Sequence, residues 1–343
     1  MSHAENVFHV LIGVHLMLAR KLPINSDKWG EDIASTPMLV PSLSSRVNID
    51  YRKTLDVLSE VITGPFLLSA YDFHYTNQFP KITFSELVFL DSGGYEAAIE
   101  KEVSEFGLYK PDPRDWNQQM HLEAVQRWDD DIPTVIISYD HPSERVSLER
   151  QIEHANNLFS QKSGIIKEIL IKPESNDSRR VNLKSFFENI DKISDFDILG
   201  FTEKELGKSI LDRMINIAKI RQKLEEHSIE IPLHIFGSLD TITTPLYYIS
   251  GADIFDGLSW LRFIFDDGAT HYINTFGPEK FGIHENSDGV WIQSVYQNYN
   301  YLGRLKINLE HFQSTGDFTK LGCKSKFFES AFNDLNEKMG GVL

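Results

Sequence analysis

The sequence predicts a (β/α)8 barrel, or TIM barrel, of the α/β class, with a helical appendage at its C-terminal end. Two observations predict this fold. Eight short apolar segments recur along the chain, and stretches with helical periodicity lie between most of them. Apolar strands that alternate with amphipathic helices are typical of a parallel sheet covered on its faces. A doubly wound open sheet is the alternative, but no G-x-G-x-x-G motif follows the first strands.

The predicted elements can be placed in order along the chain. The strand candidates span residues 36–43, 64–71, 86–91, 133–140, 167–173, 195–201, 231–238 and 252–257. Helical periodicity is clearest over 114–130, 142–161 and 203–227. Beyond residue 265, aromatic and polar residues mix over 288–312, and an amphipathic segment over 324–339 closes the chain. We therefore expect a barrel domain over 1–265 with an N-terminal hairpin, and a helical extension over 266–343 packed on the barrel.

Composition narrows the class of protein. Of the 343 residues, 41% are hydrophobic and 24% are charged, which is ordinary for a globular protein. The net charge of -16 means that the surface as a whole does not attract phosphate backbones, so nucleic-acid binding needs a local basic patch. No segment has the roughly 18 apolar residues of a membrane span. The nearest, 7–19, contains two histidines and lacks a basic flank, so we expect a buried strand or hairpin there rather than a signal peptide.

Cysteine and histidine usage argues against a metal centre. The single cysteine, Cys323, excludes both a disulfide within the chain and a cysteine-based zinc site. The 12 histidines show no ligand spacing such as H-E-x-x-H. We expect no metal, no cofactor and a reducing, cytoplasmic setting, with Cys323 as a small buried residue.

Polar residues and glycines gather where the predicted strands end. In a barrel, the C-terminal ends of the strands meet at one mouth, where the chemistry takes place. Any one aspartate there could be a helix N-cap, and any one glycine a turn residue, but their shared location indicates a site. Two aspartates in one mouth suit reaction at a sugar carbon, because one carboxylate can attack the anomeric carbon while the other handles the proton of the leaving group. The residues at these ends are Asp91, Asp140, Lys172, Gly200, Gly237 and Asp256.

Four segments, in order along the chain, carry a resemblance to a known family. They are "TPMLVPSLSSR" from residue 36, "FLDSGGYE" from residue 89, "ISYDHP" from residue 137 and "HIFGSLDTITTPLYYISGADIFDG" from residue 234. Together they resemble the tRNA-guanine transglycosylase (queuine/archaeosine tRNA-ribosyltransferase) superfamily. Enzymes of that family exchange guanine for a 7-deazaguanine base.

The resemblance implies roles for individual residues. Asp256 would attack C1′ of the ribose and form a covalent glycosyl-enzyme, and Asp91 would be the general acid/base. Asp140 would accept hydrogen bonds from the guanine N1–H and 2-amino groups, and Tyr95 would stack on the base. The backbone N–H near Gly200 would reach the base O6. The remaining substrate-pocket residues would be Ser92, Gly93, Gly94, Phe201, Lys172, Gly237 and Arg262, with the paired glycines letting the backbone turn closely around a flat base.

The sequence also departs from the family pattern. The family zinc site of three cysteines and a histidine is missing. The Gln that usually follows the fifth strand aligns with Lys172, and the Gly-Gly-Leu of the sixth strand reads Leu199-Gly200-Phe201. The basic loop after the nucleophile retains only Arg262. The resemblance implies a pentosyltransferase acting on tRNA or, as in a related branch, on DNA.

The expected partners are that nucleic acid and a free 7-deazaguanine base. A homodimer or a complex with another protein is also considered, and no membrane association is expected. Two alternatives stay open. One is a non-catalytic partner subunit of such an enzyme, against which the presence of both Asp91 and Asp256 argues. The other is a nucleosidase or N-glycosyl hydrolase acting on small molecules, which an acidic surface would suit.

Overall fold

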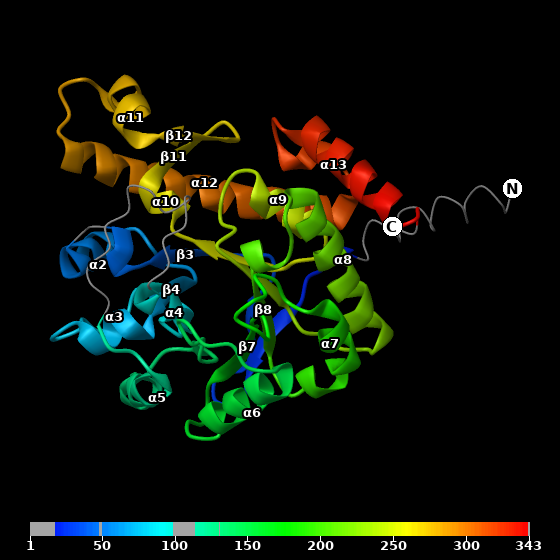
Figure 1. Ribbon diagram of the computed structural model, residues 1–343. Coiled ribbons are helices and arrows are strands. Elements are labelled where there is room, and N and C mark those ends of the chain that lie inside the picture. Colours follow the sequence, from blue (N-terminus) through cyan, green and yellow to red (C-terminus); the bar gives the residue numbers. More distant parts are fainter. Residues whose placement is uncertain (1–17, 48–49, 99–113, 130, 342–343) are drawn as a thin grey trace, which may run out of the picture.

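A closed barrel of eight parallel strands forms the centre of the molecule (Figure 1). The computed structural model describes residues 18–47, 50–98, 114–129 and 131–341. Neighbouring strands follow one another along the chain, and the last strand pairs with the first to close the ring. Each strand overlaps one of the eight apolar segments, so the predicted fold class is confirmed. The strands are β3 (Met38–Leu43), β4 (Phe66–Ser69), β5 (Val88–Asp91), β6 (Thr134–Ile137), β7 (Ile166–Ile171), β8 (Ile198–Thr202), β9 (Leu233–Phe236) and β10 (Ile254–Gly257).

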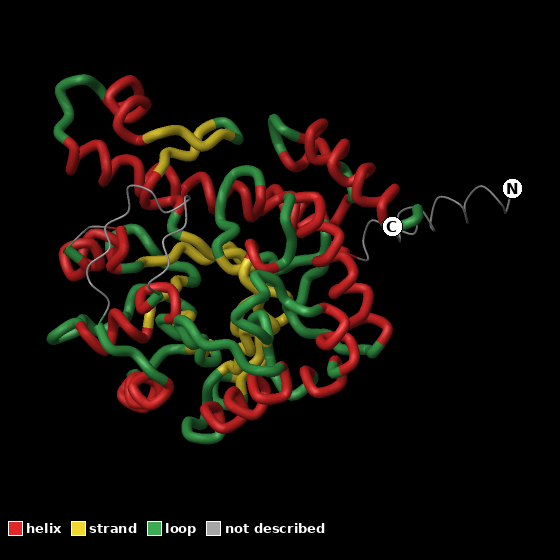
Figure 2. The backbone as a smooth tube through the Cα atoms, viewed as in Figure 1, coloured by secondary structure: helices red, strands yellow, loops and turns green. Residues whose placement is uncertain are grey.

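Helices surround the strands and cover the outside of the barrel (Figure 2). Their starts follow local capping chemistry. The long helix of segment 203–227 begins only at Ile210, because Ser209 and Asp212 form a capping box there. Asn117 and Ser147 cap two other helices with their side-chain oxygens. The helices are α2 (Tyr51–Ser59), α3 (Ala70–Tyr75), α4 (Gly94–Ala97), α5 (Gln118–Arg127), α6 (Leu148–Phe159), α7 (Leu183–Glu188), α8 (Ile210–Glu226) and α9 (Thr243–Ile249).

Strand alternation sorts the buried residues into two cores. Successive side chains of a strand point to opposite faces, so every second residue enters the barrel. The apolar inner core includes Met38, Val40, Leu67, Phe89, Val135, Ile137, Ile166, Leu170, Ile198 and Ile254. The intervening residues, such as Leu199, Phe201 and Phe255, belong to the larger core that includes the buried faces of the helices. This parity decides which residues can reach the barrel mouth.

A hairpin precedes the barrel. Its strands β1 (Pro23–Ser26) and β2 (Gly30–Ser35) pair antiparallel. Residues 7–17, where a strand or hairpin was expected, lie outside the described residues. None of the helices in the described ranges is long and apolar enough to cross a membrane.

The C-terminal extension contains a small sheet as well as helices. After α10 (Ser259–Arg262), strands β11 (Phe263–Asp266) and β12 (Ala269–Tyr272) form an antiparallel pair. Asp267 and Gly268 join them with φ values of 42° and 70°, as a two-residue hairpin turn requires. The Asp-Gly pair was a sequence signal for this turn. The helices that follow are α11 (Ile273–Phe281), α12 (Ser287–Thr315) and α13 (Ser325–Lys338).

Buried polar contacts fix the extension to the barrel. The fully buried Asn298 of α12 donates to the carbonyls of Trp260 and Phe263 and accepts the Phe265 N–H at 2.7 Å. The Trp260 indole donates in turn to the Ser42 carbonyl of β3, at 2.9 Å. Helix α13 packs beside α8 and α9 (Figure 1). Cys323, expected to be buried, is exposed where the turn before α13 brings its Sγ to the Asp267 carbonyl, so that prediction is wrong.

Candidate active site

A cavity of about 450 Å³ opens at the C-terminal ends of the barrel strands. Its volume lies in the range of small-molecule pockets. It collects predicted site residues from five strands and the segments that follow them. The predicted residues that line it are Asp91, Ser92, Gly94, Tyr95, Asp140, Lys172, Gly237, Asp256 and Arg262.

Asp256 lies deep in this cavity with donors around both of its oxygens. It enters the barrel because it stands two residues after the inward-facing Ile254 on β10. The Ser42 hydroxyl donates to Oδ2 and the Gly237 N–H donates to Oδ1, each at 2.9 Å. His234 Nε2 lies 3.4 Å from Oδ1, the distance of an ion pair rather than of a well-aligned hydrogen bond. These contacts stabilise an ionised carboxylate in one orientation.

Asp91 has the opposite electrostatic environment. Its burial, followed by the charges of Glu96 and Asp256, raises its pKa to about 8, although the Gly93 N–H donates to its Oδ2 at 3.2 Å. Glu96 is itself buried and accepts from the hydroxyls of Ser44 and Ser69. The pocket therefore pairs Asp91, whose raised pKa favours the protonated form at neutral pH, with Asp256, whose oxygens face donors, and acid-assisted displacement needs such a pair.

A fourth carboxylate, Asp72, lies close to this group. Burial and the neighbouring Glu96 raise its pKa well above the ordinary value, although it accepts the Ser45 N–H at 2.8 Å. Nothing in the sequence pattern pointed to Asp72 or Glu96, because both lie on short helices after the strands. The charge of Glu96 raises the pKa of both Asp91 and Asp72.

Asp140 belongs to a compact network of two acids and two bases. Arg145 Nη1 lies 3.0 Å from its Oδ1, and Lys172 Nζ lies 3.2 Å from its Oδ2. Glu205 lies 2.8 Å from the same ammonium group and 3.9 Å from Arg145. Burial lowers the pKa of Lys172, but Asp140 and Glu205 outweigh that effect and raise it. Lys172 is therefore a charged donor at the pocket wall, beside a carboxylate acceptor.

The Asp-Ser-Gly-Gly-Tyr segment turns sharply for steric reasons. Gly93 has φ +82°, and a Cβ there would stand 2.6 Å from the Cβ of Tyr71. A Cβ on Gly94 would meet the Asp140 carbonyl at 2.8 Å. Both positions require glycine so that the segment can pass between α3 and the Asp140 loop. Beyond the turn, the Tyr95 ring lines the cavity and lies 4.4 Å from the Arg46 guanidinium.

Gly200 and Phe201 do not line the cavity, in contrast to Gly94 and Tyr95. Phe201 points outward, is fully buried and packs edge-to-face on Phe186 of α7. Gly200 faces inward but lies below the cavity, where a Cβ would collide with Glu168 and Phe236. Strand parity explains both placements, because consecutive residues of β8 must face opposite sides. Gly93 likewise sits behind the cavity wall.

Several residues of the site were missed by the sequence reasoning. Phe236 lies beside Gly200 and lines the cavity. Its ring stacks on that of His234, with the ring centroids 3.9 Å apart. Glu168 and His234 are completely buried inside the barrel. A charged residue within the apolar run "KEILIK" was the available signal for Glu168. Arg145, in a loop, and Glu205, at the end of a short 3-10 helix (Glu203–Glu205), had no such signal.

The described residues were also compared with the ligand sets of metal sites. No group of three or more His, Cys, Asp or Glu side chains there is arranged to hold a metal ion. The acids of the cavity are instead paired with hydroxyls, backbone N–H groups and cations, as described above.

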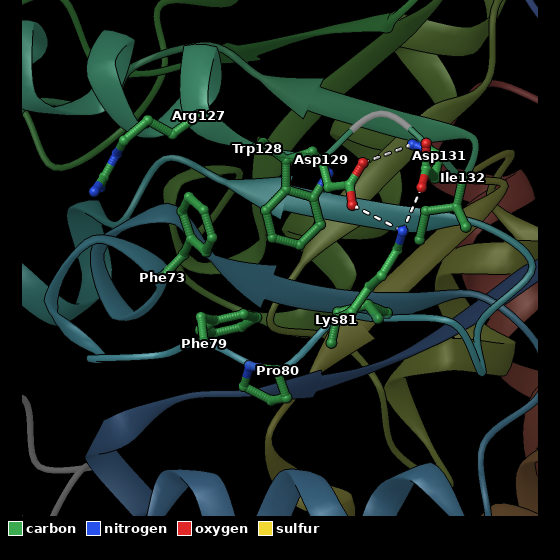
Figure 3. A pocket seen from close by; sticks show the side chains of 10 residues that line it. Phe73, Phe79, Pro80, Lys81, Arg127, Trp128, Asp129, Asp131 and Ile132 are labelled. Atoms are coloured by element: carbon green, nitrogen blue, oxygen red, sulfur yellow. Dashed lines mark hydrogen bonds and ion pairs between the residues drawn. The ribbon is translucent and has the colours of Figure 1, made fainter.

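A second, smaller cavity of about 170 Å³ lies between the end of α3 and the end of α5 (Figure 3). Phe73, Phe79 and Trp128 pack edge-to-face along it. Lys81 is paired with Asp129, at 3.2 Å, and with Asp131 (Figure 3). Because both acids of this cavity pair with Lys81, and it contains no predicted site residue, we assign it no function.

Comparison with known proteins adds no assignment. No protein-family model matches the sequence, and no curated protein matches it. The geometry of the barrel mouth therefore carries the functional argument.

Proposed function

We propose that the protein is a pentosyltransferase that exchanges guanine for a 7-deazaguanine-type base in a nucleic acid, tRNA or DNA, through a covalent glycosyl-Asp256 intermediate. One observation carries this proposal. Asp256 and Asp91 line the same cavity, and donors surround Asp256. Burial and the neighbouring charges raise the pKa of Asp91 to about 8. The resemblance of four ordered segments to the tRNA-guanine transglycosylases supports the same reaction.

The reaction divides into two displacements at one carbon. An Asp256 oxygen attacks C1′ of the target nucleotide, and the bond from C1′ to the guanine nitrogen breaks with its electron pair going to the base. The carboxyl proton of Asp91 neutralises the departing guanine. The incoming base then gives a proton to the Asp91 carboxylate and attacks C1′, which releases Asp256 as a carboxylate. Both aspartates return to their starting states, as exchange catalysis requires.

The cavity wall is complementary to the edge of guanine. That edge presents one acceptor, O6, next to two donors, N1–H and the 2-amino group. The Lys172 ammonium group is a donor, and it lies 3.2 Å from an oxygen of the acceptor Asp140. The pair therefore offers a donor for O6 next to an acceptor for N1–H and the 2-amino group. Phe236 and Tyr95 supply aromatic faces on which a base can stack. In this proposal Lys172 takes over the contact to O6 that was expected from the backbone near Gly200.

Binding of a polymer must overcome the charge of the chain. With a net charge of -16, the protein as a whole repels phosphates, and Arg262 is a basic residue at the cavity rim. We propose that a second copy or a protein partner contributes the missing positive surface. The single cysteine fits a reaction in the reducing cytoplasm.

A base-exchange assay tests the proposal. Radiolabelled guanine would be incubated at low salt with the protein and either bulk tRNA or duplex DNA. We expect label in one polymer, and its loss in Asp256→Asn but not in the matched control Asp334→Asn, an exposed aspartate of α13. Trapping of a protein–nucleic acid adduct by the wild type alone would identify the intermediate. Unchanged exchange by Asp256→Asn would overturn the nucleophile assignment.

The acidic surface favours a second candidate, an N-glycosyl hydrolase that cleaves small nucleosides. Such an enzyme would use the same two aspartates, with water in place of the incoming base. Chromatography of free nucleosides incubated with the protein separates the candidates. Base release without any polymer, together with no label in tRNA or DNA, would favour the hydrolase over base exchange.

A further inference from the structure

Two charged residues lie inside the barrel directly below the candidate nucleophile. Glu168 on β7 and His234 on β9 are both completely buried. His234 Nδ1 lies 2.7 Å from Glu168 Oε1, and its other nitrogen, Nε2, faces Asp256 Oδ1 at 3.4 Å. The three side chains therefore form a chain from the barrel interior to the floor of the cavity.

Gly200 makes this chain possible. The registers of β7, β8 and β9 place Gly200 beside Leu170 on one side and His234 on the other. Glu168 must cross β8 to reach His234, and it does so over Gly200. A Cβ at Gly200 would stand 2.8 Å from Glu168 Oε1 and 2.7 Å from the ring of Phe236. The missing side chain thus leaves the path that Glu168 occupies.

The charges facing His234 keep its imidazole protonated. Burial by itself lowers the pKa of His234, but the carboxylates of Glu168 and Asp256 outweigh it and raise the pKa to about 9. These two carboxylates, from β7 and β10, are the charged groups that face the His234 ring among the described residues. Phe89 and Phe236 pack on it and carry no charge. His234 is therefore a buried cation between two acids.

A structural role alone explains this arrangement poorly. Apolar residues would fill the barrel interior at lower cost, because desolvating charges is expensive even when they are paired. Glu168 Oε2 and His234 Nε2 also have no hydrogen-bond partner. Buried polar groups without partners are uncommon in proteins, and a catalytic role is one explanation for them.

We propose that Glu168 and His234 are positioning residues that hold Asp256 ionised and fix its orientation for attack on C1′. This inference rests on the proposed function, in which Asp256 is the nucleophile. The imidazolium stabilises the carboxylate before attack and again when the second displacement releases it. Glu168 maintains the imidazolium and fixes the direction of its ring, and Gly200 leaves room for Glu168.

Kinetics of neutral variants test the positioning role. His234→Gln and Glu168→Gln remove a charge with little change in size, and His311→Gln and Glu329→Gln, both exposed, are the matched controls. For His234→Gln we expect kcat of base exchange to fall about 10- to 100-fold with KM within about twofold. The fall should be larger at acidic than at alkaline pH, because the Asp256 carboxylate loses the neighbouring cation that opposes its protonation. A fall that is equal at every pH, or wild-type kinetics, would overturn the inference.

A titration without substrate keeps the test independent of activity. NMR of histidine-labelled wild-type protein, with the His234 signal assigned from its loss in His234→Gln, should show an imidazolium that persists above pH 8. In Glu168→Gln the same transition should fall by about one pH unit or more. A neutral His234 at pH 7, in a protein whose base exchange requires Asp256, would overturn this inference alone. Normal exchange by Asp256→Asn would overturn the proposed function, and this inference with it.

Discussion

The Ser42 hydroxyl donates to Asp256 Oδ2 at 2.9 Å, although the two residues are 214 positions apart in the chain. The contact exists because β10 pairs with β3 and closes the barrel. The same hydroxyl oxygen accepts the Gly257 N–H at 3.1 Å. Ser42 therefore holds both the side chain of the candidate nucleophile and the backbone that follows it.

Replacement of Ser42 by alanine should slow base exchange more than it weakens the fold. A hydrogen bond to a charged group is worth about 1.5 to 3 kcal/mol, and its loss frees Asp256 to rotate. We expect kcat to fall about tenfold in Ser42→Ala, measured by guanine exchange under saturating conditions. Ser330→Ala, at an exposed position of α13, is the control. An unchanged kcat in Ser42→Ala would remove this contact from the mechanism.

Base exchange should depend on the protonated form of Asp91. Because burial, Glu96 and Asp256 raise its pKa to about 8, the acid form predominates at neutral pH and is lost above that value. We expect the rate of guanine release to decline as the pH rises through about 8. In Asp91→Asn this decline should be absent and the residual rate should be low throughout. A rate that keeps rising to pH 9 in the wild type would contradict the acid role.

The same carboxyl should make the fold less stable at high pH. The folded-state pKa of about 8 lies above the usual aspartate value, so the folded protein holds a proton that the unfolded chain has lost. Stability therefore falls as the pH rises from about 4 to 8 and is level beyond. We expect Asp91→Asn to raise the free energy of unfolding by about 1 to 2 kcal/mol at pH 8 and by less at pH 5. Denaturant unfolding at both values measures this, and a larger gain at pH 5 would contradict it.

The effects of replacing Lys172 and Glu205 on the free energy of unfolding should not be additive, because the two side chains form an ion pair. Removing Lys172 leaves two carboxylates, Asp140 and Glu205, with Arg145 as their remaining cation. We expect Lys172→Met to cost about 3 kcal/mol of unfolding free energy, as for other broken ion pairs in the interior. The double variant Lys172→Met/Glu205→Gln should recover part of that loss. A double-mutant cycle gives the coupling energy, and strictly additive single effects would rule the pairing out.

Two glycines should respond to alanine in opposite directions. At Gly93, a positive φ and a Cβ only 2.6 Å from Tyr71 make alanine destabilising by more than about 1 kcal/mol. At Gly303, inside α12, a Cβ meets nothing within 4 Å, so alanine should stabilise the helix by up to about 1 kcal/mol. Thermal unfolding of both variants checks the pair. A stabilised Gly93→Ala would show that the turn is not strained.

The sequence was informative where a local pattern determines the structure. The apolar runs set the eight strands, and the residues that end them, such as Asp91 and Asp256, reached one cavity because parallel strands of a barrel end at one mouth. The hairpin of β11 and β12 was not expected, although the Asp267-Gly268 turn signals it. Phe201 was expected at the site, yet it follows the inward-facing Gly200 in β8, so its side chain points toward the helices.

What the sequence by itself determined was therefore the barrel and the carboxylates at the ends of its strands, because both follow from periodicity and from the direction of the strands. Only the tertiary structure decided the charge state and partners of those carboxylates. Burial and the convergence of Glu96 and Asp256 set the proton on Asp91, and Glu168 reaches His234 across the gap at Gly200. These contacts join residues far apart in the chain. Their energies depend on distances of a few ångströms and on exclusion of water, which no local pattern encodes.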